Sequence, residues 1–541
     1  MQNTNLTASD DSSLKRSSGP HPVILIPQPS DDPNDPLNWP LWRRDLITCI
    51  LCLLSVLAST LSPLLAANTL SLVLAFRKPF TSIALLTGYH LLGVGLAGFL
   101  FVPSARVWGK RHLYLLGTVI IIISSVWGGA SGTNYKSLLA ARVFQGVGLA
   151  PFEALVNVSV GDLYFVHERG KRMALSNLSL FGGAFFTPVI VGKMTSTLGW
   201  QWTFYFCAIF TGALLPLLFF FVPETTFNRA DYLNTDSTRL TEREHYKTAP
   251  EASVADMHHT PQHNRGLVFG LGLFNGRHTD ESYFKLLLRP FPLFFHPGVL
   301  WACLIQGTLI GWTVLIGIVL AAIMLGPPLF FNEVQTGYMY TGAFIGALLG
   351  FILAGLISDP CIKLLTRWNK GVYEPEFRLV LVIPQLIFGC AGLYGFGITA
   401  NNTTKYGWVR LPSPPPPYTI ILPPFLDPTN DSQFWPDFFF SLEVIGMVLG
   451  AVASALYLVD AHRDMAVEAF TCLLVFKNIF SFGLTFSGYD WLVQGGVKPV
   501  FTIIASVQVG VCCLTFFMYV FGKWNRAFFA RHDLLAAMRL K

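Results

Sequence analysis

Two ionisable side chains, Arg142 and Glu153, interrupt an apolar stretch that is long enough to cross a membrane. A charge at the centre of a spanning helix costs about 2.5–3.5 kcal/mol on insertion scales, so such residues mark ion or substrate pathways. Their spacing is close to three turns of an α-helix, which places both on one face. Gln145 and Asn157 fall on that face too. The pattern predicts a helix that presents a polar stripe to something other than lipid.

The chemistry of this stripe follows from desolvation. A desolvated glutamic acid favours its neutral form, and a nearby arginine or a cationic ligand favours the charged form. Glu153 is therefore a candidate for exchanging a proton in step with a cationic substrate. Arg142 has two interpretations, because it could face substrate or could pair with an acidic neighbour and hold helices together.

The composition indicates a polytopic membrane protein. Of 541 residues, 52% are hydrophobic and only 13% are charged, whereas a soluble globular protein carries about 25% charged residues. The net charge of +6 is small, and its placement in short loops fits membrane topology better than nucleic-acid binding. The nine cysteines lie mostly in apolar segments, which favours buried free thiols over disulfides.

Twelve apolar segments approach the length of about 20 residues that is needed to cross a bilayer. They form two sets of six, at 45–66, 83–104, 113–131, 137–160, 175–195 and 202–223, and at 299–323, 336–358, 379–399, 437–459, 465–488 and 498–521. The sequence therefore predicts an all-α polytopic membrane protein with an N-terminal half at 44–223 and a C-terminal half at 299–522.

Polar segments flank and separate these halves. We expect residues 1–43 to be a disordered cytosolic tail, 224–298 a cytosolic linker with an aromatic interfacial segment, and 523–541 a second cytosolic tail. Lys and Arg are more frequent in the loops on the side of the N-terminus, which predicts that both termini are cytosolic. The loop 400–436 then lies outside. It holds three glycosylation candidates, Asn401, Asn402 and Asn430.

Several motifs resemble the major facilitator superfamily of secondary transporters, over about residues 40–525. The run R-V-F-Q-G-V-G from Arg142 to Gly148 resembles the fourth-helix motif R-x-x-Q-G-x-G, and Pro223-Glu224-Thr225 resembles the P-E-T that closes the sixth helix. Asn38-Trp39-Pro40 and the runs 162–170 and 369–379 resemble a fungal branch near the drug:proton antiporters and the polyamine and histidinol transporters. The resemblance implies two pseudo-symmetric six-helix bundles that work by alternating access.

The loop after the second span departs from the family pattern G-x-L-x-D-R-x-G-R-K. Arg106 stands where the family has the Asp that helps to latch the two halves, whereas Lys110 and Arg111 keep the basic end of the motif. Asp359 remains in the corresponding loop of the second half, so the resemblance implies an acidic latch there. We therefore expect gating or structural roles for these four charges.

In the family the first, fourth, seventh and tenth helices line a central cavity, which implies candidates in the second half. Glu443 on the tenth span is the second acidic candidate, and Gln306 and Trp312 are candidates on the seventh. Lys477 and Glu468 lie on nearly opposite faces of the eleventh span, so they should not pair with each other. Lys477 should pair with an acid on another helix, and Glu443 is one possible partner.

The sequence thus predicts a proton-coupled secondary transporter for a small organic solute, cationic and polyamine-like, with Glu153 the leading protonation site and Glu443 the second. A multidrug:proton efflux antiporter and a non-transporting nutrient sensor are the alternatives. No phosphate-binding pattern G-x-x-x-x-G-K-[ST] is present, so ATP-driven pumping is not indicated. We expect no enzyme activity, cofactor, metal or nucleic-acid partner. The partners are substrate, protons and lipid, and we expect a monomer in the plasma membrane, or alternatively in the vacuolar membrane.

Overall fold

The structure is a computed structural model. It describes residues 27–227, 276–279, 281–325, 331–369, 374–406, 431–461 and 465–532, together with the single positions 25, 272, 535, 538 and 540. Within these ranges the regular secondary structure is helical, and no strand is present. All nine cysteines are free thiols, as predicted.

Twelve long helices form two groups that follow one another along the chain. The first half contains α1 (Leu41–Thr60), the short α2 (Thr69–Phe76), α3 (Phe80–Trp108), α4 (Arg111–Gly129), α5 (Tyr135–Leu163), α6 (Val166–Leu198) and α7 (Trp200–Phe221). The second half contains α11 (Pro297–Leu325), the short α12 (Glu333–Tyr338), α13 (Thr341–Trp368), α14 (Val382–Tyr406), α15 (Asp431–Ala461), α16 (Ala466–Gly495) and α17 (Val497–Arg531). The short elements η2 (Pro36–Asn38), α9 (Tyr283–Leu288), α10 (Pro290–Phe294) and η4 (Pro375–Leu381) complete the described structure.

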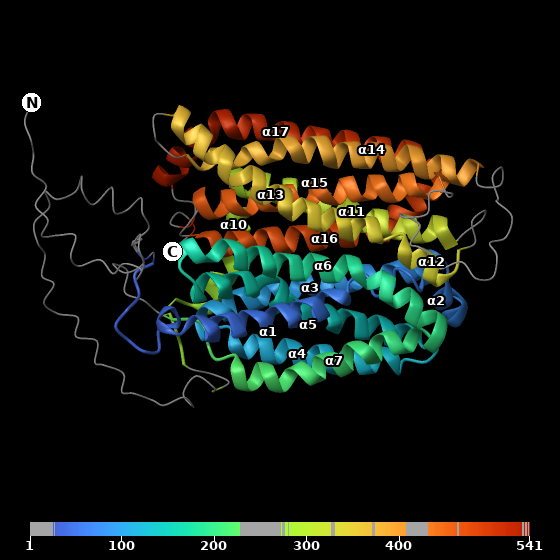
Figure 1. Cartoon of the computed structure of the whole chain (residues 1–541), viewed down its shortest axis with the longest axis horizontal. Helices are drawn as coiled ribbons and strands as arrows, with labels where there is room; N and C mark the ends of the chain where they lie inside the picture. The colour runs from blue at the N-terminus through green and yellow to red at the C-terminus, as the bar shows by residue number, and fades with distance from the viewer. Residues whose placement is uncertain are drawn as a thin grey trace, which may run out of the picture.

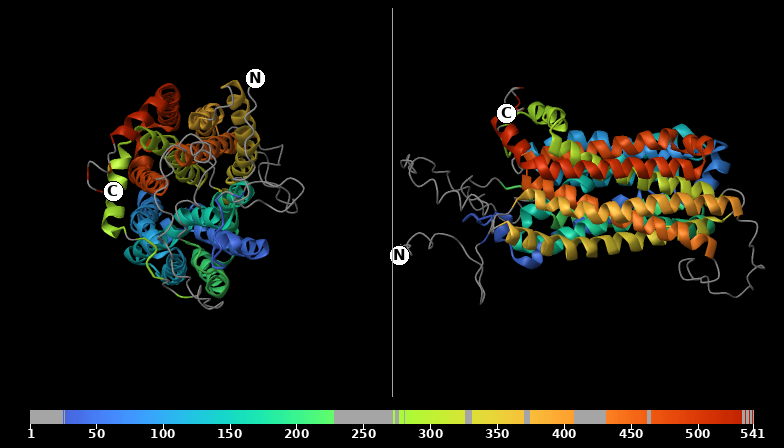
Figure 2. Two further views of the ribbon diagram at one scale, coloured as in Figure 1. Left: turned by 90° about the vertical axis from the view of Figure 1, so that its left-hand side faces the viewer. Right: turned by 90° about the horizontal axis from the view of Figure 1, so that it is seen from above.

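The long helices run side by side, with α1 and α3–α7 on one side and α11 and α13–α17 on the other (Figure 1). The end-on view in Figure 2 separates the same two groups. Eleven helices in the described part of the chain are long and apolar enough to cross a membrane. The twelfth is α1, which carries Arg43, Arg44 and Asp45 near its start. The predicted fold class, twelve transmembrane helices in two six-helix bundles, is confirmed.

Several predicted boundaries move by a few residues. Helix α1 ends at Thr60, and a turn leads into α2, so the first span is shorter than predicted. Asn401 and Asn402 lie in the last turns of α14 instead of a loop, because the helix continues beyond its apolar stretch. Asp359 lies inside α13, and its side chain falls outside the described residues, as does Asn430. These positions leave glycosylation a prediction.

Part of the expected disordered tail is folded. The carboxylate of Asp35 is fully buried and accepts hydrogen bonds from the backbone N–H and the hydroxyl of Ser30, both at 3.0 Å. It also accepts one from the backbone N–H of Leu37 at 3.1 Å, which caps η2. A side chain that satisfies backbone donors in this way fixes a local turn. The segment before α1 is therefore ordered by its own polar residues.

Helices α3 and α5 approach each other through glycine. A Cβ atom on Gly146 would lie 2.0 Å from the carbonyl oxygen of His90, and one on Gly93 would lie 2.4 Å from the carbonyl oxygen of Val143. Small residues let spanning helices pack backbone to backbone, where van der Waals contact replaces the hydrophobic effect. Gly146, which belongs to the fourth-helix motif, is thus a packing residue.

The substitution Gly146→Ala should destabilise the first half. The added methyl group meets backbone that cannot move aside, and overpacking of this kind costs about 1–3 kcal/mol. Thermal unfolding of the purified protein in detergent measures the loss. Gly161→Ala on the same helix is the matched control, because its Cβ would meet nothing within 4 Å. Equal melting temperatures for the two variants would contradict the packing role.

Helices α3 and α16 join the two halves along their length. Thr81 donates to Asp490 at 3.2 Å at one end, and Arg106 contacts Glu468 at the other. The end of the bundle at which α1 begins and α3 finishes is called the tail end below, and the opposite end is called the loop end. At the loop end the hydroxyl of Ser71 also donates to Glu333 across the halves at 2.6 Å.

Candidate functional site

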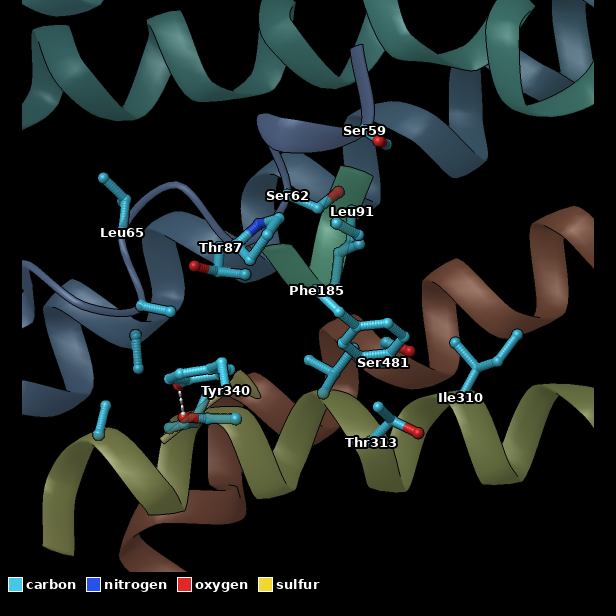
Figure 3. A pocket seen from close by; sticks show the side chains of 18 of the residues that line it. Ser59, Ser62, Leu65, Thr87, Leu91, Phe185, Ile310, Thr313, Tyr340 and Ser481 are labelled. Carbon is cyan, nitrogen blue, oxygen red and sulfur yellow. Dashed lines mark hydrogen bonds between the residues drawn. The ribbon is translucent and has the colours of Figure 1, made fainter. Parts of the chain in front are cut away.

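A cavity of about 190 Å³ lies between the two halves. Its walls are mainly apolar, and Figure 3 shows Leu91 and Phe185 from the first half opposite Ile310 from the second. The polar groups in the lining are few: the hydroxyls of Ser59, Ser62, Thr69, Thr87, Thr313, Tyr340 and Ser481, the amide of Asn478, and the charged side chains of Glu153 and Lys477. A mostly apolar cavity with a few convergent polar groups is typical of a small-molecule site.

Glu153 on α5 and Lys477 on α16 form an ion pair across the two halves, in which Lys477 Nζ donates to Glu153 Oε1. Their side chains are only 12% and 8% exposed. Within the described part of the chain neither makes a further hydrogen bond or ion pair. Lys477 does pair with an acid on another helix, as expected. Glu443, named as one possible partner, is wrong, because the acid that Lys477 contacts is Glu153 of α5.

Glu443 lies directly behind the cavity wall. Its side chain is fully buried, and the hydroxyl of Thr313, which lines the cavity, donates to Glu443 Oε1 at 2.8 Å. The second oxygen, Oε2, has no hydrogen-bond partner among the described residues. Glu443 is therefore linked to the cavity by the hydroxyl of Thr313, and its Oε2 is an acceptor without a donor among the described residues.

Arg142 and Gln145 are fully buried and do not line the cavity. The guanidinium of Arg142 donates to the carbonyl oxygens of Leu61 at 2.6 Å, Ser62 at 3.3 Å and Leu86 at 3.4 Å, and to Gln145 Oε1 at 2.9 Å. These bonds tie α5 to the turn after α1 and to α3. The spacing predicts that Arg142 and Glu153 share one face of the helix. The turn after α1 covers this face around Arg142, whereas around Glu153 the face is open to the cavity.

The other predicted polar residues hold helices within one half. Asn157 donates to Asn177 on α6 at 2.8 Å. On α11, Gln306 accepts from Ser454 at 2.9 Å and Trp312 donates to Gln508 at 3.1 Å. None of the three lines the cavity.

Sequence reasoning missed several buried polar residues, among them the cavity-lining Asn478 and three residues that make hydrogen bonds between helices or turns. His90 on α3 contacts the hydroxyl of Ser62 through Nε2 at 3.1 Å, Gln508 on α17 accepts from Trp312, and Asp437 near the start of α15 accepts from the backbone of Gly342 at 3.2 Å. Each interrupts an apolar segment, which was the signal that identified Glu153.

At the tail end, four charges from three parts of the chain form what we call the tail-end charge cluster: Arg106 of α3, Glu281 and Arg289 of the linker segment, and Glu468 of α16. Glu468 accepts from Arg106 at 2.5 Å and from Arg289 at 3.3 Å, and its side chain is only 6% exposed. Burial alone would raise the pKa of Glu281, but the hydrogen bond from Arg289 and the charges of Arg106 and Arg289 lower that pKa below its usual value. The carboxylate of Glu281 is therefore charged near neutral pH.

Lys110 and Arg111 act within the first half. Lys110 pairs with Asp162 at the end of α5. Arg111 donates to the carbonyl oxygens of Phe219 and Val222 at the end of α7. Glu224 accepts from the backbone N–H groups of Lys110 and Arg111, both at 3.0 Å, which satisfies donors at the start of α4. The P-E-T motif thus anchors α4 to α7.

Glu468→Gln should loosen the tail end. It leaves the guanidinium groups of Arg106 and Arg289 without the buried carboxylate that they share, which we expect to cost about 1–3 kcal/mol. Hydrogen–deuterium exchange should accelerate in the last turns of α3 and the first turns of α16. Glu376→Gln is the matched control, because Glu376 is equally buried but pairs with Arg526 inside the second half. The same exchange pattern in both variants would argue against a latch between halves.

Comparison with known proteins agrees with this architecture. Residues 46–413 match the family described as the Major Facilitator Superfamily. Protein HOL1 of Saccharomyces cerevisiae is 24% identical, over 95% of this chain and 91% of that protein. An uncharacterised MFS-type transporter of Schizosaccharomyces pombe is 25% identical, over 94% of this chain and 87% of that protein.

Solved structures are similar in fold. The crystal structure of a D-xylose-proton symporter matches with a TM-score of 0.54 and 16% identity, over 87% of this chain and 97% of that one. The xylose transporter XylE from E. coli, in a partially occluded inward-open conformation, matches with a TM-score of 0.53 and 14% identity, over 88% of this chain and 99% of that one. At these identities the likeness concerns the fold alone.

Proposed function

The chain belongs to the Major Facilitator Superfamily, and we propose that it moves a small organic cation, polyamine-like in character, by proton-coupled alternating access. It is a multi-pass membrane transporter and not an enzyme. The observation that carries the proposal is the carboxylate of Glu153 in the wall of a mainly apolar cavity between the two halves. The proposal assigns the tail end to the cytosol of a monomer in the plasma membrane.

The lining supports a cationic substrate with an alkyl body. Glu153 provides a carboxylate at the cavity surface. On the opposite half, Glu443 lies behind Thr313 and accepts a hydrogen bond from the hydroxyl of this cavity-lining residue. Apolar side chains such as Leu149 and Ile310 cover most of the remaining wall, so methylene groups can be desolvated there. The charge of Arg142 does not oppose this, because carbonyl oxygens surround its guanidinium outside the lining.

Proton coupling is supported by the position of the same carboxylates. An ionisable group between the halves of a spanning bundle can bind a proton or a cation, and competition between the two couples their movements. Glu153 is the leading proton site because it touches the cavity, and Glu443 is the second because one of its oxygens is unbonded. A neighbour in fold is described as a proton symporter, which agrees with this mechanism.

A multidrug:proton antiporter is the second candidate. Aromatic side chains from both halves, among them Phe80, Phe181, Phe185 and Phe440, line the cavity. Flat aromatic walls suit lipophilic drugs as well as alkyl chains. The direction of gradient-driven transport in vesicles separates the two candidates, because an antiporter moves its substrate against the inward flow of protons.

Glu153→Gln should abolish the response to a proton gradient. In proteoliposomes, an imposed inward proton gradient should drive uptake of labelled spermidine by the natural protein. The variant should lose that uptake by at least about tenfold, or about 1.4 kcal/mol, because the amide neither binds a proton nor pairs with a cation. Glu376→Gln, a buried carboxylate outside the cavity, should transport normally. Unchanged uptake by Glu153→Gln across the pH range would remove this residue from the mechanism.

A further inference from the structure

We propose that Lys477 is a built-in competitor of the substrate: in the empty cavity its ammonium group occupies the cation site at Glu153, and a cationic substrate binds by displacing it. This inference rests on the proposed function, because it assumes that the transported solute carries an ammonium group. It assigns to Lys477 a positioning role that is distinct from a permanent structural ion pair.

The first support is the sparse bonding of Lys477. An ammonium group has three donors, but within the described part of the chain Lys477 donates only to Glu153. Arg142, the other strongly buried cation near the cavity, makes four hydrogen bonds: two to the turn after α1, one to α3 and one to Gln145 on its own helix. Four hydrogen bonds must break before the guanidinium of Arg142 can move. The ammonium group of Lys477 can move once its single contact with Glu153 breaks.

The second support is the place of the pair. Both side chains line the cavity, so a ligand inside it can reach the contact between them. The ammonium group of Lys477 stands at the end of four methylene groups, and it has the same charge, size and hydrogen-bonding capacity as a primary amine of a ligand. A site that accepts one therefore accepts the other.

The energetics favour one-for-one exchange. An unpaired carboxylate in an apolar wall is costly, so Glu153, while it is charged, keeps a cation beside it whether the cavity is empty or holds substrate. Substrate binding replaces one ammonium group by another and leaves the net charge at Glu153 unchanged. Ser481 lies one turn after Lys477 on α16 and lines the same cavity, so its hydroxyl oxygen is an acceptor for the displaced ammonium group.

The exchange has a mechanical consequence, because Glu153 belongs to α5 of the first half and Lys477 to α16 of the second. Displacement of Lys477 removes an ion pair between the halves. A bound substrate thus loosens the contact that must break before the halves can rock, whereas the empty cavity keeps it. This links occupancy to movement through one side chain.

Two substitutions at Lys477 should change affinity in opposite directions. Lys477→Gln removes the competitor, so equilibrium binding of labelled spermidine to the purified full-length protein should tighten by at least about tenfold. Lys477→Arg supplies a cation that holds a carboxylate through two parallel hydrogen bonds, so binding should weaken. Lys110→Gln is the matched control, because Lys110 pairs with Asp162 at the tail end, away from the cavity, and its loss should leave affinity unchanged.

The double variant Glu153→Gln/Lys477→Gln should lose the gain, because the carboxylate that Lys477 masks is gone. Weaker or equal binding by both Lys477 variants would overturn the inference and would indicate a purely structural pair, while spermidine uptake by the natural protein would leave the proposed function standing. A natural protein that neither binds nor transports spermidine, with Lys477→Gln equally inactive, would contradict the proposed function itself. Melting temperatures establish that each variant is folded, and Lys477→Arg keeps the charge if Lys477→Gln does not fold.

Discussion

A charge inside a bundle of membrane-spanning helices must have a partner, and this constraint decides which residues of the protein are free to act. Arg142 satisfies it with carbonyl oxygens and an amide, which fixes three parts of the first half together. Glu153 satisfies it with one lysine from the other half, whereas the buried carboxyl group of Glu443 accepts a single hydrogen bond, from Thr313. The fewer the bonds that hold a buried charge, the more readily a proton or a ligand can take their place.

The same constraint organises the contact between the halves. Polar contacts join them at the tail end through Arg106 and Glu468 and at the loop end through Ser71 and Glu333, and the cavity lies between. Between these ends α3 and α16 meet through small residues such as Gly95 and Gly98, which face Asn478 and Leu474. The polar contacts at the tail end and at the loop end are separate, so one can break while the other stays. The close contact through glycine between α3 and α16 lets these two helices rotate against each other. This arrangement suits alternating access.

The spans were predictable because hydropathy is a property of each segment alone, and Glu153 could be found because it interrupts such a segment. The partner of Lys477 could not be found this way. Helical periodicity gives the direction of a side chain on its own helix, but it does not say which helix lies opposite. For the same reason Arg142 and Glu153 were expected in one environment, although the turn after α1 covers only the first of them. Asn401 was expected in a loop because it follows the apolar stretch, but α14 continues beyond that stretch to Tyr406.

Arg106 departs from the family pattern but still makes an ion pair between the two halves. The resemblance predicted an acidic residue at this position, and its absence suggested that the first half had lost its part of the latch. In the structure Arg106 still contacts the second half, because α16 supplies the buried carboxylate of Glu468 and the linker adds Glu281 and Arg289. An ion pair between two bodies requires opposite charges, but it does not matter which body carries which sign. A contact between the halves is thus kept at this position, with an arginine in the first half and a carboxylate in the second, and the linker takes part in it. Any movement that opens the tail end must therefore also shift the segment that connects the halves.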